Sequence, residues 1–238
     1  MFGKNEVAGK RTVADGFLVH SIFYTIQGEG PWAGKPTIFV RFAGCNLRCF
    51  FCDTDFTGGE LFTPEGLAEN LVDLATTTGC NHFVLTGGEP LLQPLPALLR
   101  LMPEACRFQI ETAGTVWQSG LEDYLEPKRL IIVVSPKAPL VHPDIRAHAA
   151  AWKYIIRAGE LNDTDGLPES STQREGEYAG ICRPPAGTPR SAIYVQPCDE
   201  SGMRTPPEID DNIKAAVAVA LKYGYNLSMQ IHKYAGVE

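Results

Sequence analysis

The sequence predicts an α/β fold in which a mostly parallel sheet, open or barrel-like, forms one domain. Apolar, β-branched-rich runs recur along the 238 residues, and amphipathic stretches separate several of them. Strand, helix and strand repeated along a chain imply right-handed crossovers and parallel pairing. Because fewer than eight such units fit in this length, we do not expect a closed eight-fold barrel.

The expected strands are nearly continuous in apolar character, as in strands covered on both faces. They lie at 37–42, 82–86, 107–111, 130–135, 152–157, 192–196 and 227–231.

The expected helices carry recognisable start and stop signals. Thr63 supplies an N-cap and Pro64 a first-turn proline for a helix that runs to about Ala75. The stretches 91–101 and 207–223 show the same periodicity, and Gly224 ends the second of them.

One region, 159–190, breaks this pattern. It is rich in Gly, Pro, Ser, Thr and charged residues and has little periodicity. We expect a surface insertion within a single domain 1–238, and not a linker between two domains.

Composition excludes several classes of protein. The chain is 44% hydrophobic, which excludes wholesale disorder, and its net charge of -7 argues against binding to nucleic acid. No uncharged apolar run approaches the ~18 residues of a membrane span, so we expect a soluble protein. Seven cysteines, an odd number, without an export signal indicate free thiols in a reducing compartment, the cytoplasm.

Polar clusters follow the ends of the expected strands. They are Gly44-Cys45, Gly87-Gly88-Glu89-Pro90, Glu111-Thr112, Ser135-Pro136-Lys137, Gln196-Pro197-Cys198-Asp199 and His232-Lys233-Tyr234. Ligands bind at the carboxyl ends of strands in parallel α/β folds, so one edge of the sheet is predicted to be a binding site.

Cys45, Cys49 and Cys52 form a dense group on a short loop directly after the first expected strand. Soft thiolates select iron–sulfur clusters, zinc or copper(I). Electron-transfer clusters commonly use four cysteines, so three would leave one iron of a 4Fe–4S cube open to a small chelating ligand. The alternative is a structural zinc site completed by Cys80 or His82, but the second Cys pair that zinc sites usually have is absent.

The other cysteines, Cys80, Cys106, Cys182 and Cys198, are better explained as ordinary core or surface thiols.

The spacing Cys-x-x-x-Cys-x-x-Cys, with the aromatic Phe51 before the last cysteine, resembles the radical S-adenosylmethionine enzymes. In that family the amino and carboxylate groups of S-adenosylmethionine chelate the open iron. Reduction of the cluster then cleaves the cofactor to a 5′-deoxyadenosyl radical, which takes a hydrogen atom from the substrate.

Further strings resemble one branch of that family, the 7-carboxy-7-deazaguanine synthases. They are residues 23–30, 39–45, 52–56, 86–90 and 134–137, Gln196-Pro197 with Asp199, and 228–234. The resemblance runs from about residue 16 to the end and does not explain 159–190. It implies a partial, modified (β/α) barrel with mostly parallel strands, usually a homodimer. The implied reaction contracts the ring of 6-carboxy-5,6,7,8-tetrahydropterin to 7-carboxy-7-deazaguanine and releases ammonia, with a 4Fe–4S cluster, S-adenosylmethionine and Mg2+.

The resemblance implies a set of substrate-binding residues. They are Ile26, Gln27, Gly28, Glu29, Arg41, Thr86, His232 and the terminal Glu238. The glycines in 27–30 would let the backbone approach a ligand, and the Glu29 carboxylate could accept from the N–H groups of an amino-pyrimidinone edge. A surface turn is the alternative for 27–30. Arg41 in an apolar strand needs a partner, either a substrate carboxylate or a structural Asp or Glu. A lone histidine such as His232 is otherwise more often structural.

The resemblance also implies a set of residues that bind S-adenosylmethionine. They are Phe51, Gly88, Glu89, Glu111, Ser135, Pro136, Lys137, Gln196, Pro197, Cys198 and Asp199. Gly87 and Gly88 would let the backbone approach a ligand, and Glu89 would accept from the methionyl ammonium, although a plain strand-to-helix turn explains them too. The family usually has Asn where this chain has Ala113, so any contact from that side chain is lost.

Thr54, after Cys52 and Asp53, matches the family's Mg2+ ligand, with the remaining ligands from substrate and water. A simple turn is the alternative for Asp53-Thr54-Asp55.

Two other functions share part of this pattern. A glycyl-radical-enzyme activase has the cysteine loop and the Gly-Gly-Glu-Pro element but acts on a protein, and it has no reason to carry 27–30, Thr54 or His232. A non-catalytic zinc or iron–sulfur scaffold is the other possibility. For the enzyme, we expect a reductant protein such as flavodoxin or ferredoxin, and no nucleic acid or membrane partner.

Overall fold

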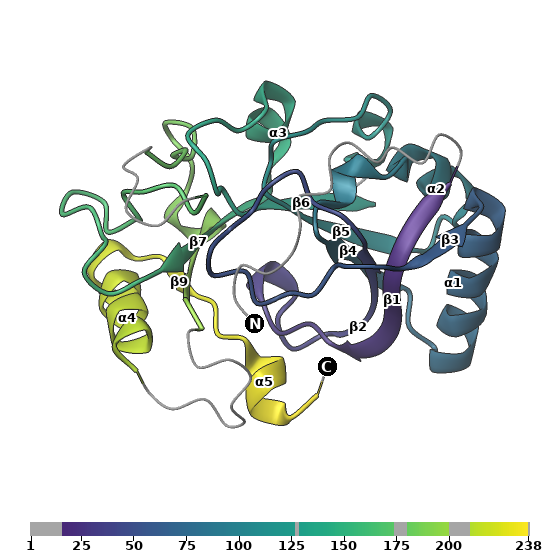
Figure 1. Cartoon of the computed structure of the whole chain (residues 1–238), viewed down its shortest axis with the longest axis horizontal. Coiled ribbons are helices and arrows are strands. Elements are labelled where there is room, and N and C mark those ends of the chain that lie inside the picture. The colour runs from purple at the N-terminus through teal and green to yellow at the C-terminus, as the bar shows by residue number, and fades with distance from the viewer. Residues whose placement is uncertain (1–15, 127–128, 174–179, 200–209, 238) are drawn as a thin grey trace.

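The computed structural model describes residues 16–126, 129–173, 180–199 and 210–237. Its centre is a nine-stranded sheet with the order β3-β1-β2-β4-β5-β6-β7-β8-β9. β1 pairs antiparallel with β2 and β3, and the other neighbours pair in parallel. The sheet curves without closing, and α1, α2 and α4 lie outside it (Figure 1). The predicted α/β class with a mostly parallel, open sheet is confirmed.

The strands are β1 Phe17–Ile26, β2 Pro36–Phe42, β3 Glu60–Phe62, β4 His82–Gly87, β5 Arg107–Thr112, β6 Leu130–Val134, β7 Ala151–Ile156, β8 Ile193–Pro197 and β9 Asn226–Leu227. The α-helices are α1 Pro64–Thr78, α2 Leu95–Leu101, α3 Pro143–His148, α4 Asp211–Tyr223 and α5 Ile231–Ala235. Short 3-10 helices lie at Gly30–Trp32, Pro90–Leu92, Glu122–Tyr124 and Arg190–Ala192.

Alternation of side chains along the strands gives the sheet two chemically different faces. The outer face joins the helices in one apolar core, which includes Ile38, Val40, Phe42, Phe83, Leu85, Phe108, Ile110, Trp152, Tyr154 and Ile156. The residues between them point inward and include Arg41 on β2, Glu111 on β5 and Lys153 on β7. The inner face is therefore the one that can bind a polar ligand.

Six of the predicted strands, β2 and β4 to β8, are present within one residue of their predicted ends. α1 begins as expected, since the Thr63 hydroxyl accepts a hydrogen bond from the Gly66 N–H at 3.0 Å, and it runs on to Thr78. The sequence does not predict β1, β3, α3 or α5. β1 has a register shift between Val19 and Ser21 and carries polar residues in its middle, so it lacks the continuous apolar run that marks the other strands.

The predicted strand 227–231 is wrong, because β9 ends at Leu227. The Ser228 N–H donates to Val195 O at 2.9 Å, and the chain then leaves the sheet. The Ile231 N–H donates instead to Gly28 O at 3.2 Å, and Ile231 begins α5.

The predicted helix 91–101 is divided in two. A 3-10 helix, Pro90–Leu92, comes first, and Gln93 is extended with ψ 149° before Pro94. A residue before proline is disfavoured in the α region, so α2 starts only at Leu95. α4 starts at Asp211 because the Asp210 carboxylate accepts from the Ile213 N–H at 2.9 Å, and 207–209 lie outside the described residues.

The described parts of 159–190 contain one short bridge, Leu161 with Pro168, and little other regular structure before residue 190. The segment returns to the cysteine loop, where the Phe50 N–H donates to Thr172 O at 3.1 Å. In the described ranges no helix is long and apolar enough to cross a membrane.

The outer core predicts a large effect of a single truncation. Leu85 in β4 is fully buried, so Leu85→Ala should lower the free energy of unfolding by about 2–5 kcal/mol, from lost burial and the cavity left behind. Leu221→Ala, at a leucine that is 82% exposed on α4, should change it by about 0.5 kcal/mol or less. Urea unfolding of both variants measures the difference. Equal effects would contradict the assignment of the core.

Candidate active site

A cavity of about 600 Å³ lies inside the curved sheet, at the carboxyl ends of the strands. This size is typical of sites for small molecules and cofactors. The sequence-predicted residues that line it are Ile26, Gln27, Glu29, Arg41, Cys45, Cys49, Phe51, Cys52, Thr54, Thr86, Gly88, Glu111, Ser135, Lys137, Gln196 and His232. Residues far apart in the chain therefore meet in one space.

Other predicted site residues do not line this cavity. They are Gly28, Glu89, Pro136, Pro197, Cys198 and Asp199. Pro136 lies instead beside a small neighbouring cavity with Phe50. Glu238 lies outside the described residues.

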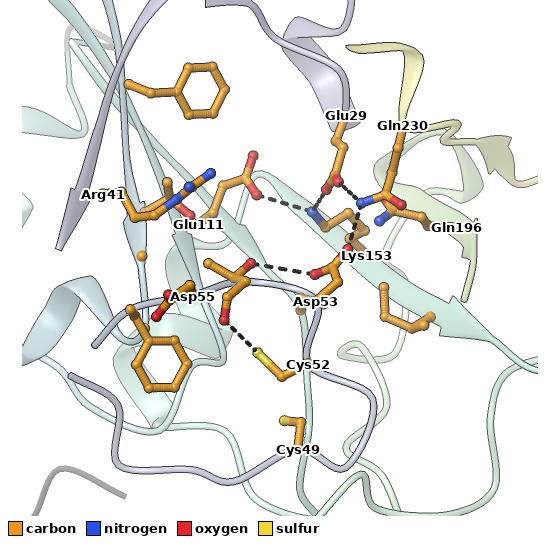
Figure 2. A pocket seen from close by; sticks show the side chains of 18 of the residues that line it. Glu29, Arg41, Cys49, Cys52, Asp53, Asp55, Glu111, Lys153, Gln196 and Gln230 are labelled. Carbon is orange, nitrogen blue, oxygen red and sulfur yellow. Dashed lines mark hydrogen bonds and ion pairs between the residues drawn. The ribbon is translucent and has the colours of Figure 1, made fainter. Parts of the chain in front are cut away.

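The cysteine loop, 45–52, follows β2 and forms one end of the cavity. Figure 2 shows Cys49 and Cys52 at this end, away from Glu29 and Lys153. Burial raises the pKa of the Cys45 thiol to about 12 and also raises that of Cys52. Among the described residues, no fourth cysteine lines the cavity. This donor set fits a 4Fe–4S cluster with three protein ligands, since a bound metal holds such thiols as thiolates.

The zinc alternative does not fit this geometry. Cys80 and His82 lie at the start of β4, whereas the cavity is at its end. The Cys80 thiol donates to Pro36 O at 3.3 Å, and the His82 ring packs edge-on to Trp32 at 5.1 Å. Among the described residues, no group of three or more His, Cys, Asp or Glu could hold a single metal ion.

The Gly87-Gly88 pair packs against the backbone of the cysteine loop. A Cβ added to Gly88 would lie 1.9 Å from Gly44 O, and one added to Gly87, whose φ is +132°, would lie 2.1 Å from Phe42 O. The close approach predicted at this pair is thus made to the chain itself, although both glycines also line the cavity.

The Glu89 carboxylate is fully buried beneath this contact. It accepts from the Leu91 N–H at 3.1 Å, the Thr112 hydroxyl at 2.7 Å and the Ala113 N–H at 2.9 Å. Burial raises its pKa, and these donors oppose the rise. These contacts are those of the alternative interpretation, a plain strand-to-helix turn. A contact from Glu89 to S-adenosylmethionine stays a prediction.

Lys153 lies between two carboxylates at the other end of the cavity. Its side chain is 6% exposed, and its ammonium pairs with Glu29 and, at 3.1 Å, with Glu111. Burial alone would lower the pKa of Lys153, but the two carboxylates raise it. Burial likewise opposes ionisation of Glu29, yet Lys153 and Gln230 bring its pKa down to about 2. Sequence reasoning missed Lys153, although its signal, a charged residue in an apolar strand, is the one that singled out Arg41.

Gln27 and Gln230 fix the orientation of Glu29. The Gln27 amide donates to Glu111 Oε1 at 2.8 Å and accepts from the Glu29 N–H at 3.0 Å. Gln230 donates to Glu29 Oε1 at 2.8 Å (Figure 2). A carboxylate has about four lone-pair sites, so Glu29 keeps capacity for a ligand donor.

Arg41 supplies the positive charge on the opposite wall. Its guanidinium lies 5.1 Å from the centre of the Phe23 ring. Its Nε is buried and has no hydrogen-bond partner among the described residues. A buried donor without a partner is costly, so a ligand acceptor is a natural complement.

His232 reaches the cavity from α5, where it sits directly on the backbone of Gly28. A Cβ at Gly28 would lie 1.8 Å from His232 Nδ1, so only glycine leaves room for the imidazole. Burial, as the largest cause, lowers the pKa of His232 and favours the neutral ring. In this structure Gly28 packs against the His232 ring, and its predicted contact with substrate stays a prediction.

Asp53-Thr54-Asp55 forms a turn in the wall of the cavity. Asp55 accepts from the Thr57 N–H at 2.9 Å and from the Thr57 hydroxyl at 2.7 Å, as in the turn alternative. These two hydrogen bonds lower the pKa of Asp55. Asp53 pairs with Lys233 at 2.9 Å. All three residues of the triplet line the cavity.

Lys137 and Lys233 order the remaining predicted segments. The Lys137 ammonium folds back to donate to Ser135 O at 3.1 Å. Lys233 also pairs with Asp199 at 2.7 Å, which places Asp199 behind the cavity wall.

Comparisons with known proteins agree with this geometry. The model of the Radical SAM superfamily matches residues 39–158. A 7-carboxy-7-deazaguanine synthase of Rhodospirillum rubrum is 43% identical and covers 98% of both chains. Enzymes of that name from Rickettsia prowazekii and Hyperthermus butylicus are 34% and 35% identical and cover at least 90% of both chains.

The chain belongs to the 7-carboxy-7-deazaguanine synthase family of radical SAM enzymes. It therefore uses a 4Fe–4S cluster and S-adenosylmethionine. The solved structure of QueE from Escherichia coli matches the fold with a TM-score of 0.60 at 22% identity, over 90% of this chain and 93% of that one. This likeness confirms the predicted partial barrel.

The buried charges predict a strong effect of Lys153→Met. Two carboxylates would lose their cation, so the free energy of unfolding should fall by about 3–5 kcal/mol at pH 7. The wild-type Glu29 pKa of about 2 lies below its unfolded value, so wild-type stability falls as pH drops from about 4.5 towards 2. In the variant, burial without Lys153 raises the pKa of Glu29, and protonation stabilises the folded state as pH falls.

The difference in the free energy of unfolding between wild type and Lys153→Met should therefore become smaller from pH 7 to pH 3, as measured by urea unfolding. Lys214→Met is the control, because its ion pair with Asp211 is largely exposed and should contribute about 1 kcal/mol or less. A gap that widens on acidification would contradict the paired state of Glu29.

Proposed function

We propose that this chain contracts the ring of 6-carboxy-5,6,7,8-tetrahydropterin to 7-carboxy-7-deazaguanine with release of ammonia. The observation that carries the proposal is one cavity with three thiols at one end and Glu29, Arg41 and His232 around the rest of it. A cluster-bound cofactor and a polar heterocycle would thus lie in contact, as a hydrogen-atom transfer between them requires. The family assignment supports the same reaction.

Cys45, Cys49 and Cys52 would hold the 4Fe–4S cluster, and the strand-end residues Ser135, Lys137 and Gln196 would contact S-adenosylmethionine. When bound, these groups supply the radical that removes a hydrogen atom from the substrate. The protein then needs to bind and orient the cofactor and the substrate and to exclude water. No acid–base pair is required for that first step.

Each polar residue suits one part of a carboxypterin. Glu29, held ionised by Lys153, can accept the N–H groups of the amino-pyrimidinone edge. Arg41 lines the opposite wall, and its guanidinium can pair with the substrate carboxylate. His232 in its neutral form can both donate and accept a hydrogen bond.

Thr54 is proposed as the protein ligand of Mg2+. Thr54 lines the cavity between two aspartates, and Mg2+ commonly takes few protein ligands while keeping others from water and substrate.

The wider assignments are proposals as well. We infer one radical SAM domain over 1–238 with 159–190 as an insertion, a cytoplasmic homodimer, and a reductant protein such as flavodoxin. Seven free cysteines suit a reducing compartment. Ile231, exposed to 36%, offers apolar surface near the cavity for a second copy.

The reaction itself is tested with anaerobically reconstituted protein, dithionite, Mg2+, S-adenosylmethionine and the carboxy-tetrahydropterin. We expect equal amounts of 7-carboxy-7-deazaguanine and ammonia, measured by mass spectrometry and an ammonia assay. Cofactor cleavage without any deazapurine would overturn the substrate assignment.

Cys45→Ala should abolish both the cluster and the activity, because two thiols remain for a cluster that needs three. Iron and sulfide analysis with the activity assay measures this. Cys80→Ala is the matched control, since that buried cysteine lies at the far end of β4. An active Cys45→Ala enzyme, or equal iron loss in both variants, would contradict the ligand assignment.

Gly28→Ala should leave the cluster intact but reduce kcat/KM by about 100-fold, because the new Cβ displaces the His232 ring. Gly180→Ala is the control, since Gly180 has open space around it and no positive φ. If Gly28→Ala turned the substrate over like wild type, the seat for His232 would not matter to the reaction.

A further inference from the structure

The segment 170–173, which the family resemblance does not explain, touches the cysteine loop through side chains. The Thr172 hydroxyl lies 3.0 Å from Cys49 Sγ, and the Gln173 amide nitrogen lies 3.5 Å from the same sulfur. Thr172 and Ser171 are each 6% exposed, so these contacts are shielded from solvent.

The same segment is held by further hydrogen bonds to both sides of the cavity end. The Phe50 N–H donates to Thr172 O at 3.1 Å, and the Arg48 N–H donates to Gln173 Oε1 at 2.9 Å. On the other side, the Thr172 N–H donates to Lys137 O at 3.1 Å. The segment thus braces the cysteine loop against the turn after β6.

The direction of the Thr172 hydrogen bond follows from counting lone pairs. Lys137 O already accepts from the Ser171 hydroxyl at 2.9 Å and from the Thr172 N–H, which fill its two lone pairs. The Thr172 hydroxyl has one proton, and its 3.3 Å approach to Lys137 O is the longer of its two options. When Cys49 is a cluster-bound thiolate, the sulfur can only accept, so Thr172 must donate to it.

We propose that the Thr172 hydroxyl, which itself accepts from the Gln173 amide at 3.1 Å, donates a hydrogen bond to the Cys49 sulfur and raises the reduction potential of the cluster. Hydrogen bonds to ligand sulfurs stabilise the more negative, reduced cluster, and such outer contacts tune the potentials of iron–sulfur proteins. The insertion therefore makes the reducing step easier for the electron donor. This role rests on Cys49 as a cluster ligand, which is part of the proposed function.

The test compares Thr172→Val, which keeps the shape and removes the hydroxyl, with Thr172→Ser, which keeps the hydroxyl. Thr188→Val is the matched control, because Thr188 lies in the same insertion, 159–190, and its hydroxyl donates to Pro185 O at 2.8 Å. The midpoint potential is read from an anaerobic redox titration followed by electron paramagnetic resonance, after iron and sulfide analysis of each variant.

Thr172→Val should retain its iron and lower the midpoint potential by about 59 mV, a tenfold loss of the reduced form at fixed potential. Thr172→Ser and Thr188→Val should stay close to wild type. A fully loaded Thr172→Val protein with an unchanged potential would overturn the proposal. Loss of iron from Thr172→Val but not from Thr172→Ser would make the hydroxyl a structural contact and also overturn it. Absence of iron from the wild type would instead defeat the proposed function.

Discussion

Two backbone hydrogen bonds beyond the ends of β2 and β4 determine where the cysteine loop begins. The Gly88 N–H donates to Phe42 O at 3.0 Å, and the Glu89 N–H donates to Gly44 O at 2.9 Å. They continue the parallel register in which Arg41 faces Thr86 and Phe42 faces Gly87. Because neither Gly87 nor Gly88 leaves room for a Cβ, the two segments approach at backbone distance. The first thiol is thereby fixed beside the residues of β2 and β4 that line the cavity.

The two ends of the cavity carry different chemical groups. Thiols gather at one end, while Lys153 holds Glu29 and Glu111 in a largely buried, hydrogen-bonded group at the other. Three elements that are distant in sequence, the end of β1, β5 and β7, supply these charges. The ion pairs of Glu29 and Glu111 with Lys153 are already formed without a ligand, so Glu29 does not need to reorient when substrate binds. This is the advantage of a preorganised polar site.

The sequence predicts the parallel core strands well because their long apolar runs are local signals. It identifies half of the residues that line the cavity, many of them through motifs that follow those strands. It does not predict β1 as a strand, because polar residues and a register shift interrupt its pattern. The Glu29–Lys153–Glu111 cluster and the packing of His232 against Gly28 depend on contacts across 42 to 204 positions of chain, which no local pattern encodes. The break in the predicted helix 91–101 before Pro94 has a local signal in the sequence, because a residue before proline avoids the helical region.

The central claim is an iron–sulfur cube with one iron left open towards the substrate end of the cavity. The electron paramagnetic resonance spectrum of the dithionite-reduced protein, recorded before and after S-adenosylmethionine is added, tests it most directly. A signal of a reduced 4Fe–4S cluster that changes shape on addition is predicted, because the cofactor would complete the coordination of the open iron. A reconstituted protein with no such signal, or with a signal that the cofactor leaves unchanged, would contradict it.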